Sequence, residues 1–299
     1  MVQTPTTLGF IGPIGFIGLG VMGGPMCRNV ITKHPGTVYV YDMNQQALRA
    51  MADLGAIACS SDVDVAKAAD ITFLSLPGGK EVMHVCGAFA VEARPGTVVV
   101  DLSTTAVADA RATASMLVAA NGILFADAPV ARTRQAAIDG TLSIMVGASD
   151  AVFARIAPLL AYMGSDVTHC GEVGCGQVVK LVNNTLLFEH VAALAEMMVV
   201  AERAGVTPEK LIAAVSLGSG DSFALRNHGL KAMAPRVFPE KAFPSPYVLK
   251  DMGYAIDLAD QIGVDPKMAQ LARSYYQSAV DAGIGEKYFP AIIELIGKD

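Results

Sequence analysis

The residue types best suited to chemistry lie in the stretch GCGQVVKLVNN, residues 174–184. Lys180 and Asn184 are four positions apart, so a helix would place both side chains on one face. A lysine amine among apolar neighbours can give or accept a proton, and an amide one turn away can orient the oxygen concerned. Taken alone, Lys180 fits equally well a structural lysine that snorkels from a buried helix. Whether Lys180 transfers protons or only packs depends on the elements that surround this stretch.

A glycine-rich turn near the N-terminus is the second candidate site. The letters GFIG occur twice, at residues 9–12 and 15–18, and only the second copy continues as G-x-G-x-x-G. That spacing gives a tight turn, close approach of a phosphate and close packing of the next helix, as in dinucleotide sites. Pro13, after the first copy, would remove a strand hydrogen-bond donor. We expect the second copy to form the first strand, and we assign the pyrophosphate to Gly18, Gly20, Val21, Met22 and Gly23.

An acidic residue follows at the distance that dinucleotide sites use. Residues 38–41, VYVY, predict the second strand, and Asp42 ends it 22 positions after Gly20. A carboxylate there binds the ribose hydroxyls of adenosine. The next residues, 43–45, contain no arginine for a 2′-phosphate, and the carboxylate would repel that phosphate. We expect NAD in preference to NADP; the alternative is an aspartate that only begins a turn.

The elements around the glycine turn alternate between strand and helix. This alternation predicts an α/β Rossmann domain, a doubly wound parallel sheet over residues 1–170. Ligands bind beyond the carboxyl ends of such strands, where Pro77, Ser103, Thr104 and Pro129 stand. Apolar runs typical of buried parallel strands occur at 71–76, 98–100, 123–126 and 142–146, and helical segments at 44–54 and 105–120.

After residue 170 the pattern becomes helical. Residues 173–204 contain no proline and, after Gly176, no glycine. They predict one helix of about 45 Å, long enough to cross the cleft between two domains. We expect an all-helical domain over residues 171–299 that binds substrate and mediates oligomerisation. Its further helices are expected at 207–216, 247–262, 266–282 and 286–297.

The composition excludes several classes of protein. The chain has 299 residues, 53% apolar and 17% charged, with a net charge of −6. Scattered basic residues argue against a nucleic-acid partner, and five cysteines without metal-ligand spacing fit a reducing cytoplasm and no metal site. We expect neither a signal peptide nor a membrane span. The apolar excess predicts helix burial that includes a subunit interface.

Four blocks recur together in a known family: GFIGLGVMG (15–23), DAPV…DGTLSIMVG (127–147), GCGQVVKLVNN (174–184) and LKDMGYA (249–255). Over residues 15 to about 297 the chain resembles the β-hydroxyacid dehydrogenase family. The resemblance implies a Rossmann domain, a helical domain, homodimers or homotetramers, and hydride transfer between NAD and a small anionic 3-hydroxy acid or its semialdehyde.

The same resemblance implies roles for individual residues. Lys180 matches the catalytic acid/base, and Asn184 matches a residue that binds substrate. Phe223, in the stretch GSGDSF, lies where the family places an aromatic residue in the substrate pocket, although ordinary core packing is an equal alternative. Leu76, Pro77, Thr104 and Lys250 match positions implied to contact NAD, and we expect Ser103 and Asn183 to contact the substrate.

The substrate loop departs from the family pattern. Where the family reads DAPVSGG, this chain reads DAPVART over residues 127–133, so Arg132 replaces a glycine. The guanidinium would crowd a carboxylate bound at the loop, but it could hold an anion placed differently, with Thr133 beside it. The loop is similar to that of sulfolactaldehyde reductases, a branch of the family that acts on a sulfonate. The serine that this branch uses is missing from the stretch TLLF after Asn184, and Arg132 could also be a surface residue.

Two classes of function compete. The first is an NAD-dependent oxidoreductase that interconverts a small anionic 3-hydroxy acid and its semialdehyde, with a sulfonate reductase as the alternative substrate class. The second is an NAD(H)-binding module without turnover. The presence of Lys180 and Asn184 argues against the module, and against an imine-reducing relative, in which the lysine is missing. No Tyr-x-x-x-Lys sequence occurs, which excludes a short-chain dehydrogenase.

Overall fold

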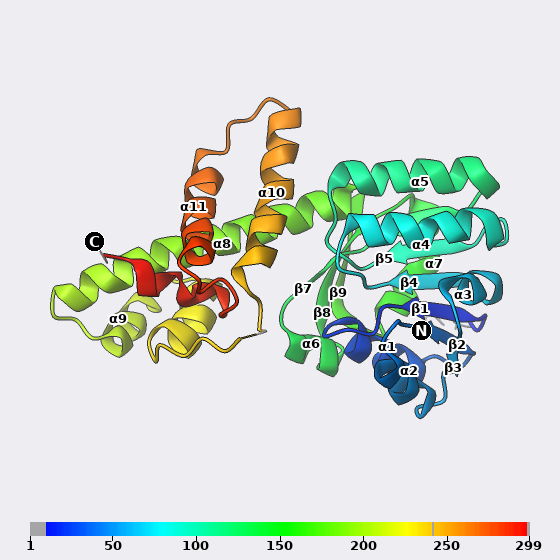
Figure 1. Ribbon diagram of the computed structural model, residues 1–299, viewed down its shortest axis with the longest axis horizontal. Helices are drawn as coiled ribbons and strands as arrows, with labels where there is room; N and C mark the ends of the chain where they lie inside the picture. The colour runs from blue at the N-terminus through cyan, green and yellow to red at the C-terminus, as the bar shows by residue number, and fades with distance from the viewer. Residues whose placement is uncertain (1–9, 241, 298–299) are drawn as a thin grey trace, which may run out of the picture. The chain divides into compact units, whose positions relative to one another are not determined.

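The computed structural model describes residues 10–240 and 242–297 (Figure 1). The chain divides into two compact units, Met1–Lys180 and Leu181–Asp299, and the division falls within the long helix α8 (Cys175–Arg203). The expected boundary at residue 170 lies earlier. The first residues of α8 stay with the first unit because their backbone is hydrogen-bonded to it.

The first unit is built on one sheet. Its parallel strands lie in the order β3-β2-β1-β4-β5-β6, the order of doubly wound dinucleotide-binding folds. The Rossmann domain expected from the sequence is therefore confirmed. The strands are β1 (Ile14–Ile17), β2 (Val38–Tyr41), β3 (Ile57–Ala58), β4 (Ile71–Leu74), β5 (Val98–Asp101) and β6 (Leu124–Asp127).

The sheet continues past β6 with three more strands. β8 (Leu142–Gly147) pairs antiparallel with β6 and with β7 (Val130–Ala131), and parallel with β9 (Gly164–Gly171). Of these three strands, only β8 was predicted from the sequence. β9 reads GSDVTHCG and is largely unburied, so it lacks the apolar run by which buried strands are recognised.

Helices cover both faces of this sheet. Figure 1 shows α4 (Gly79–Glu92) and α5 (Val107–Asn121) side by side over one face. Successive strand residues point to opposite faces, so Phe73 joins the core beneath α1 (Gly23–Lys33) whereas Leu74 joins the core beneath α4. The remaining helices of the unit are α2 (Gln45–Ala52), α3 (Asp62–Ala68), α6 (Arg134–Asp139) and α7 (Asp150–Leu160).

The duplicated GFIG resolves as the sequence predicts. Strand β1 starts at Ile14, so the second copy provides the first strand. Gly9 of the first copy lies outside the described residues. The Phe10 ring stacks on the His34 ring with centroids 6.1 Å apart, and His34 Nε2 lies 2.9 Å from the Gly12 carbonyl oxygen. The first copy is thus a packed lead-in to the sheet.

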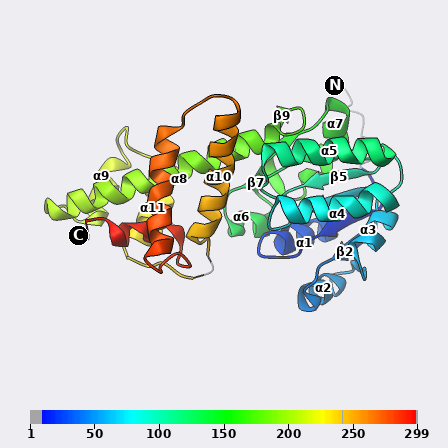
Figure 2. The same ribbon diagram turned by 45° about the horizontal axis from the view of Figure 1, so that its top comes forward.

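The second unit is helical, as expected. Its elements after α8 are α9 (Pro208–Val215), the π-helix η1 (Ala224–Met233), α10 (Ser245–Gln261), α11 (Lys267–Asp281) and the 3₁₀-helix η2 (Phe289–Leu295). α10 and α11 form an antiparallel pair (Figure 2). Phe188 of α8 packs in one core with Met252, Tyr276 and Phe289. The helix expected over 286–297 was wrong in type, because the structure has the short 3₁₀-helix η2 there.

Helix α8 is, among the described residues, the helix whose length and composition would allow it to cross a membrane. Such a stretch was not expected from the sequence. One side of α8 contributes Phe188, Val191 and Ala195 to the core of the second unit, and core helices of globular proteins pass the same test.

Candidate active site

The glycine turn joins β1 to α1. Gly18 has φ +93°, and a Cβ there would lie 2.1 Å from the Ser75 carbonyl oxygen. A Cβ on Gly23 would lie 2.0 Å from the Gly18 carbonyl oxygen, so the helix start packs directly on the turn. At Gly20 an added Cβ meets no described atom within 4 Å. The turn is therefore closed underneath and open at the position where a phosphate would approach.

The start of α1 is suited to an anion. Neither an acidic side chain in the first turn nor a side-chain cap from the described residues neutralises its N–H groups. Asp42, at the end of β2, reaches the same turn: its Oδ2 accepts a hydrogen bond from the Leu19 N–H at 2.6 Å. Its Oδ1 accepts one from the Asn44 N–H at 2.6 Å. The turn and the acid thus lie together, and these residues fit a dinucleotide with its pyrophosphate on α1 and its ribose at Asp42.

Two glycine substitutions separate folding from cofactor binding. Gly20→Ala should unfold like the wild type, because the methyl meets open space, but it should weaken NADH binding about tenfold or more by occupying the phosphate position. Gly18→Ala should instead lower the unfolding midpoint, because φ is positive and a carbonyl oxygen is in the way. Thermal melts and NADH fluorescence titration measure both. Wild-type NADH affinity in Gly20→Ala would place the pyrophosphate elsewhere.

The loops after β4 and β5 are linked beside this turn. The Leu76 N–H donates to Ser103 Oγ at 2.9 Å, and the Ser103 N–H donates to Asp101 Oδ1 at 2.9 Å. Because β1, β4 and β5 are parallel neighbours, Leu76-Pro77 and Ser103-Thr104 follow the same edge of the sheet as the glycine turn. The structure therefore brings together the residues of the first unit that the sequence assigned to NAD, and Ser103, which it assigned to the substrate.

The start of α8 is anchored at the end of β6. Asp127 Oδ1 accepts a hydrogen bond from the Gly174 N–H at 2.6 Å, and its Oδ2 accepts one from the Gln177 N–H at 2.7 Å. Burial raises the pKa of Asp127 to about 6, although the two backbone hydrogen bonds act in the opposite direction. A Cβ on Gly176 would lie 2.4 Å from the Met145 carbonyl oxygen. Because Gly176 has no side chain, the backbone of β8 and the Asp127 carboxylate can pack directly against the start of α8.

Lys180 lies one turn further along α8 and is only 8% exposed. Gln177, three residues earlier on the same helix face, is fully buried and hydrogen-bonded to the loop after β5. Lys180 thus stands on the side of α8 that meets the Ser103–Thr105 segment.

A polar cluster follows on α8 and α10 in the second unit. Asn184 is buried; its Nδ2 donates to Asp251 Oδ2 at 2.8 Å, and its Oδ1 accepts from Asn183 Nδ2 at 3.1 Å. Lys250 Nζ lies 3.4 Å from Asp251 Oδ1. Three residues implied by the resemblance, Asn183, Asn184 and Lys250, are therefore brought together, and Asp251 links them.

Arg132 and Thr133 have structural partners in the described chain. Arg132 Nη2 lies 2.7 Å from Asp166 Oδ2, and its Nη1 donates to the Thr141 carbonyl oxygen at 2.6 Å and to Ser165 Oγ at 3.0 Å. Thr133 Oγ1 caps α6 by accepting from the Ala136 N–H at 3.4 Å. The guanidinium is therefore directed to β8 and β9, and these contacts would have to break before it could hold a substrate anion.

Phe223 is half exposed and packs edge-on against the His228 ring, with centroids 5.8 Å apart. His228 is buried, and Tyr288 Oη lies 2.8 Å from its Nδ1. Burial lowers the pKa of His228 to about 4, which keeps the ring neutral. His228 is thus a core residue of the second unit. Phe223 covers its ring and leaves about half of its own surface exposed to solvent.

Three further residues were not assigned from the sequence: Asp127, Gln177 and Asp251. All three stand inside the blocks that carry the family resemblance, and Asp127 ends a strand directly before Ala-Pro. Spacing alone could have pointed to Gln177, because it shares a helix face with Lys180. Their partners are 47 to 74 positions away in the chain, so their roles depend on the fold.

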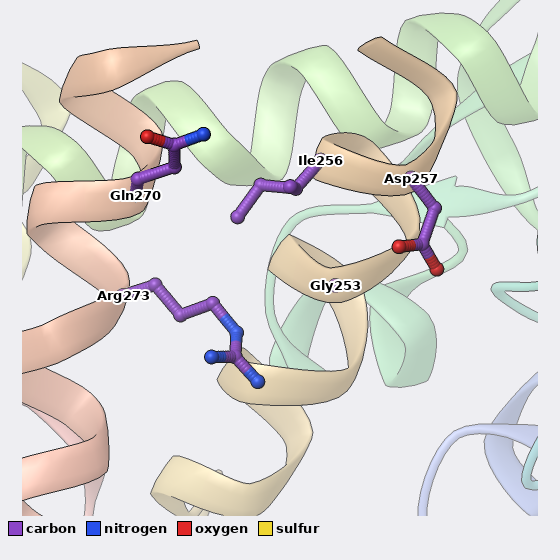
Figure 3. A pocket seen from close by; sticks show the side chains of 5 residues that line it. All are labelled: Gly253, Ile256, Asp257, Gln270 and Arg273. Atoms are coloured by element: carbon purple, nitrogen blue, oxygen red, sulfur yellow. The ribbon is translucent and has the colours of Figure 1, made fainter. Parts of the chain in front are cut away.

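A surface hollow in the second unit is lined by residues other than these. A hollow of about 320 Å³ between α10 and α11 is lined by Gly253, Ile256, Asp257, Gln270 and Arg273 (Figure 3). Figure 3 shows Arg273 reaching from α11 towards α10, while the Asp257 carboxylate lies on the far side of α10. Within residues 10–240 and 242–297, no group of three His, Cys, Asp or Glu side chains is arranged to hold a metal ion.

The comparisons with known proteins cover both units. Residues 13–171 match the family model for the NAD binding domain of 6-phosphogluconate dehydrogenase, and residues 174–296 match the model described as NAD-binding of NADP-dependent 3-hydroxyisobutyrate dehydrogenase. The 2-(hydroxymethyl)glutarate dehydrogenase of Eubacterium barkeri is 36% identical over 285 residues, 94% of either chain. A probable mitochondrial 3-hydroxyisobutyrate dehydrogenase of Dictyostelium discoideum is 32% identical over 96% of this chain and 91% of its own.

A solved structure agrees with these sequence matches. The 3-hydroxyisobutyrate dehydrogenase of Mycobacterium tuberculosis with L-serine superposes with a TM-score of 0.89 at 28% identity, covering 97% of this chain and 100% of that one.

Proposed function

The chain belongs to the β-hydroxyacid dehydrogenase family and is a nicotinamide-dependent 3-hydroxyacid dehydrogenase, and we propose that Lys180 is its general acid/base. When bound, the dinucleotide supplies the hydride chemistry. In oxidation the Lys180 amine takes the proton from the substrate hydroxyl, and in reduction it returns that proton to the oxygen. The substrate is a small anionic 3-hydroxy acid or its semialdehyde.

The location of Lys180 carries this proposal. The side chain is buried on the face of α8 whose preceding turn is bound to Ser103 and Thr105. That segment follows β5 at the sheet edge that holds the glycine turn. A buried amine beside the nicotinamide end of a dinucleotide site exchanges its proton with one substrate oxygen rather than with bulk water.

Two relatives suggest the substrate class. The relatives are named 2-(hydroxymethyl)glutarate dehydrogenase and 3-hydroxyisobutyrate dehydrogenase. In both named substrates a primary alcohol carbon is bonded directly to the carbon that bears a carboxylate. We propose a substrate of that kind for this chain. Asn184 supports the proposal, because its amide is fixed by Asp251 and Asn183 one turn after Lys180. A fixed amide can orient an oxygen of the substrate with little entropic cost.

The sulfonate alternative depends on Arg132. Its ion pair with Asp166 is about half exposed on both sides, and such pairs contribute at most about 1 kcal/mol, so a strongly bound anion could compete for it. Hydrogen bonds to the Thr141 carbonyl oxygen and to Ser165 Oγ hold the guanidinium as well. A carboxylate substrate that leaves Arg132 in place is therefore the first candidate, and a sulfonate the second.

A substrate panel tests the proposal. We expect turnover of 3-hydroxyisobutyrate or 2-(hydroxymethyl)glutarate with NAD and of their semialdehydes with NADH, and little turnover of sulfolactaldehyde. We also expect a higher kcat/KM with NAD(H) than with NADP(H) because of Asp42. Arg132→Gly should keep the same ranking, because the arginine is occupied by Asp166. It should also unfold no earlier than the wild type, because φ is +86° at this position and glycine adopts it without strain. Selective loss of one anion in Arg132→Gly would put the arginine in the pocket.

The exposed side of α8 supports association of subunits. Val182, Leu186, Met197 and Val200 are exposed at helical spacing on that side. We propose a homodimer or homotetramer that covers this stripe, and light scattering on the purified protein measures its mass. A monomer at micromolar concentration would contradict it.

A further inference from the structure

Gln177 is the buried polar side chain closest in sequence to Lys180 on its helix face. Its residue is fully buried, and both ends of its amide are used. Nε2 donates to the Ser103 carbonyl oxygen at 2.8 Å, and Oε1 accepts from the Thr105 N–H at 3.2 Å. Gln177 is fully buried and both ends of its amide are bound to backbone groups of the first unit, so it is shielded from a substrate. Its role must be exerted through other residues.

The hydrogen bonds of Gln177 join three loops at one point. Its backbone N–H is held by Asp127 at the end of β6, and its side chain holds the Ser103–Thr105 segment after β5. Ser103 Oγ in turn accepts the N–H of Leu76 after β4. The start of α8 is thereby linked to the loops after three successive parallel strands, and one of those loops holds Thr104.

We propose that Gln177 is a positioning residue that fixes the rotation and the axial position of α8 against the loop after β5, and so sets where the Lys180 amine lies. The inference rests on the proposed role of Lys180 as general acid/base. A donor and an acceptor on one rigid amide, bound to two backbone groups two residues apart, define the orientation of the helix more closely than apolar contact does. Lys180 follows after three residues, so a rotation at Gln177 is transmitted directly to it.

An apolar side chain of the same length would fill the space without fixing the helix. Gln177→Met keeps the unbranched shape and the helix propensity but leaves the Ser103 carbonyl and the Thr105 N–H unpaired. A displacement of about 1 Å at a reacting group can cost about 100-fold in rate. We therefore expect kcat of Gln177→Met to fall about 100-fold, a larger effect than the loss of NADH affinity, because the glycine turn and Asp42 are untouched.

Asn121→Leu is the matched control. Asn121 Nδ2 donates to the Ala93 carbonyl oxygen at 2.8 Å, so this variant also removes an amide-to-carbonyl hydrogen bond within the first unit, away from α8. It should lower the unfolding midpoint and leave kcat unchanged. Hydrogen exchange of the cofactor-free proteins is the second measurement. Peptides covering residues 101–106 and 174–184 should exchange faster in Gln177→Met and at the wild-type rate in Asn121→Leu.

The outcomes separate this inference from the proposed function. If the wild type is active and Lys180→Ala is not, a Gln177→Met kcat within about twofold of the wild type overturns the positioning role, and so does unchanged exchange of both peptides. If Lys180→Ala keeps full activity, the proposed function fails, whereas faster exchange in Gln177→Met still supports the helix anchor. Should Gln177→Met not fold, Gln177→Glu keeps the acceptor for Thr105, removes the donor for Ser103, and is judged by the same kcat and exchange criteria.

Discussion

Lys180→Ala is expected to lower kcat by about 1,000-fold while leaving the Kd for NADH nearly unchanged. General acid/base groups contribute about 100- to 10,000-fold, and alanine leaves the substrate hydroxyl with no amine to take its proton. The proposed NADH site of the first unit consists of the glycine turn and Asp42, which do not depend on the lysine side chain. Steady-state kinetics with the best substrate of the panel and NADH fluorescence titration measure the two quantities.

Lys180→Arg distinguishes proton transfer from simple charge. The guanidinium stays protonated at all accessible pH values, so this variant keeps a cation on the same helix face but cannot accept a proton. We expect it to be almost as slow as the alanine variant. Lys67→Ala, which removes an exposed lysine paired with Glu92, is the control and should behave as the wild type. Full activity in Lys180→Ala would remove this residue from the chemistry.

Asp127→Ala is expected to lower the free energy of unfolding of the first unit by about 2 to 4 kcal/mol. The change leaves the Gly174 and Gln177 N–H groups, both buried at the start of α8, without their acceptor. Orphaned buried donors cost about 1 to 3 kcal/mol each. Urea denaturation followed by circular dichroism gives the value. Asp150→Ala, in which the removed carboxylate is fully exposed, is the control, and an equal loss in both variants would contradict the anchoring role of Asp127.

The difference in free energy of unfolding between the wild type and Asp127→Ala should depend on pH in a definite direction. The pKa of Asp127 in the folded protein, about 6, lies above the ordinary aspartate value of 3.8 because of burial. The folded chain therefore binds this proton more readily than the unfolded chain does. The contribution of Asp127 to stability is complete below pH 3.8 and declines as the pH rises through 6. The difference between wild type and Asp127→Ala should thus be larger at pH 5 than at pH 8.

The sequence determined the parts of the protein that follow from local pattern. The buried parallel strands could be predicted because each is a short apolar run, and the helices after residue 170 because proline and glycine are missing from long stretches. The glycine turn and Asp42 were predictable from spacing, since a turn of this kind and its acid are separated by one strand–helix–strand unit. The shared face of Lys180 and Asn184 follows from the period of the helix alone.

The tertiary structure decided what those side chains touch. No pattern indicates that Arg132 pairs with Asp166, or that Asp127, Gln177 and Asp251 fix the residues of the site, because their partners are 34 to 74 positions away. The polar strand β9 escaped prediction for the same reason: it is held by pairing with β8 rather than by apolar burial. Periodicity and spacing describe one element or two adjacent ones. A buried hydrogen bond instead forms between polar groups that folding brings together and shields from water, wherever they lie in the chain.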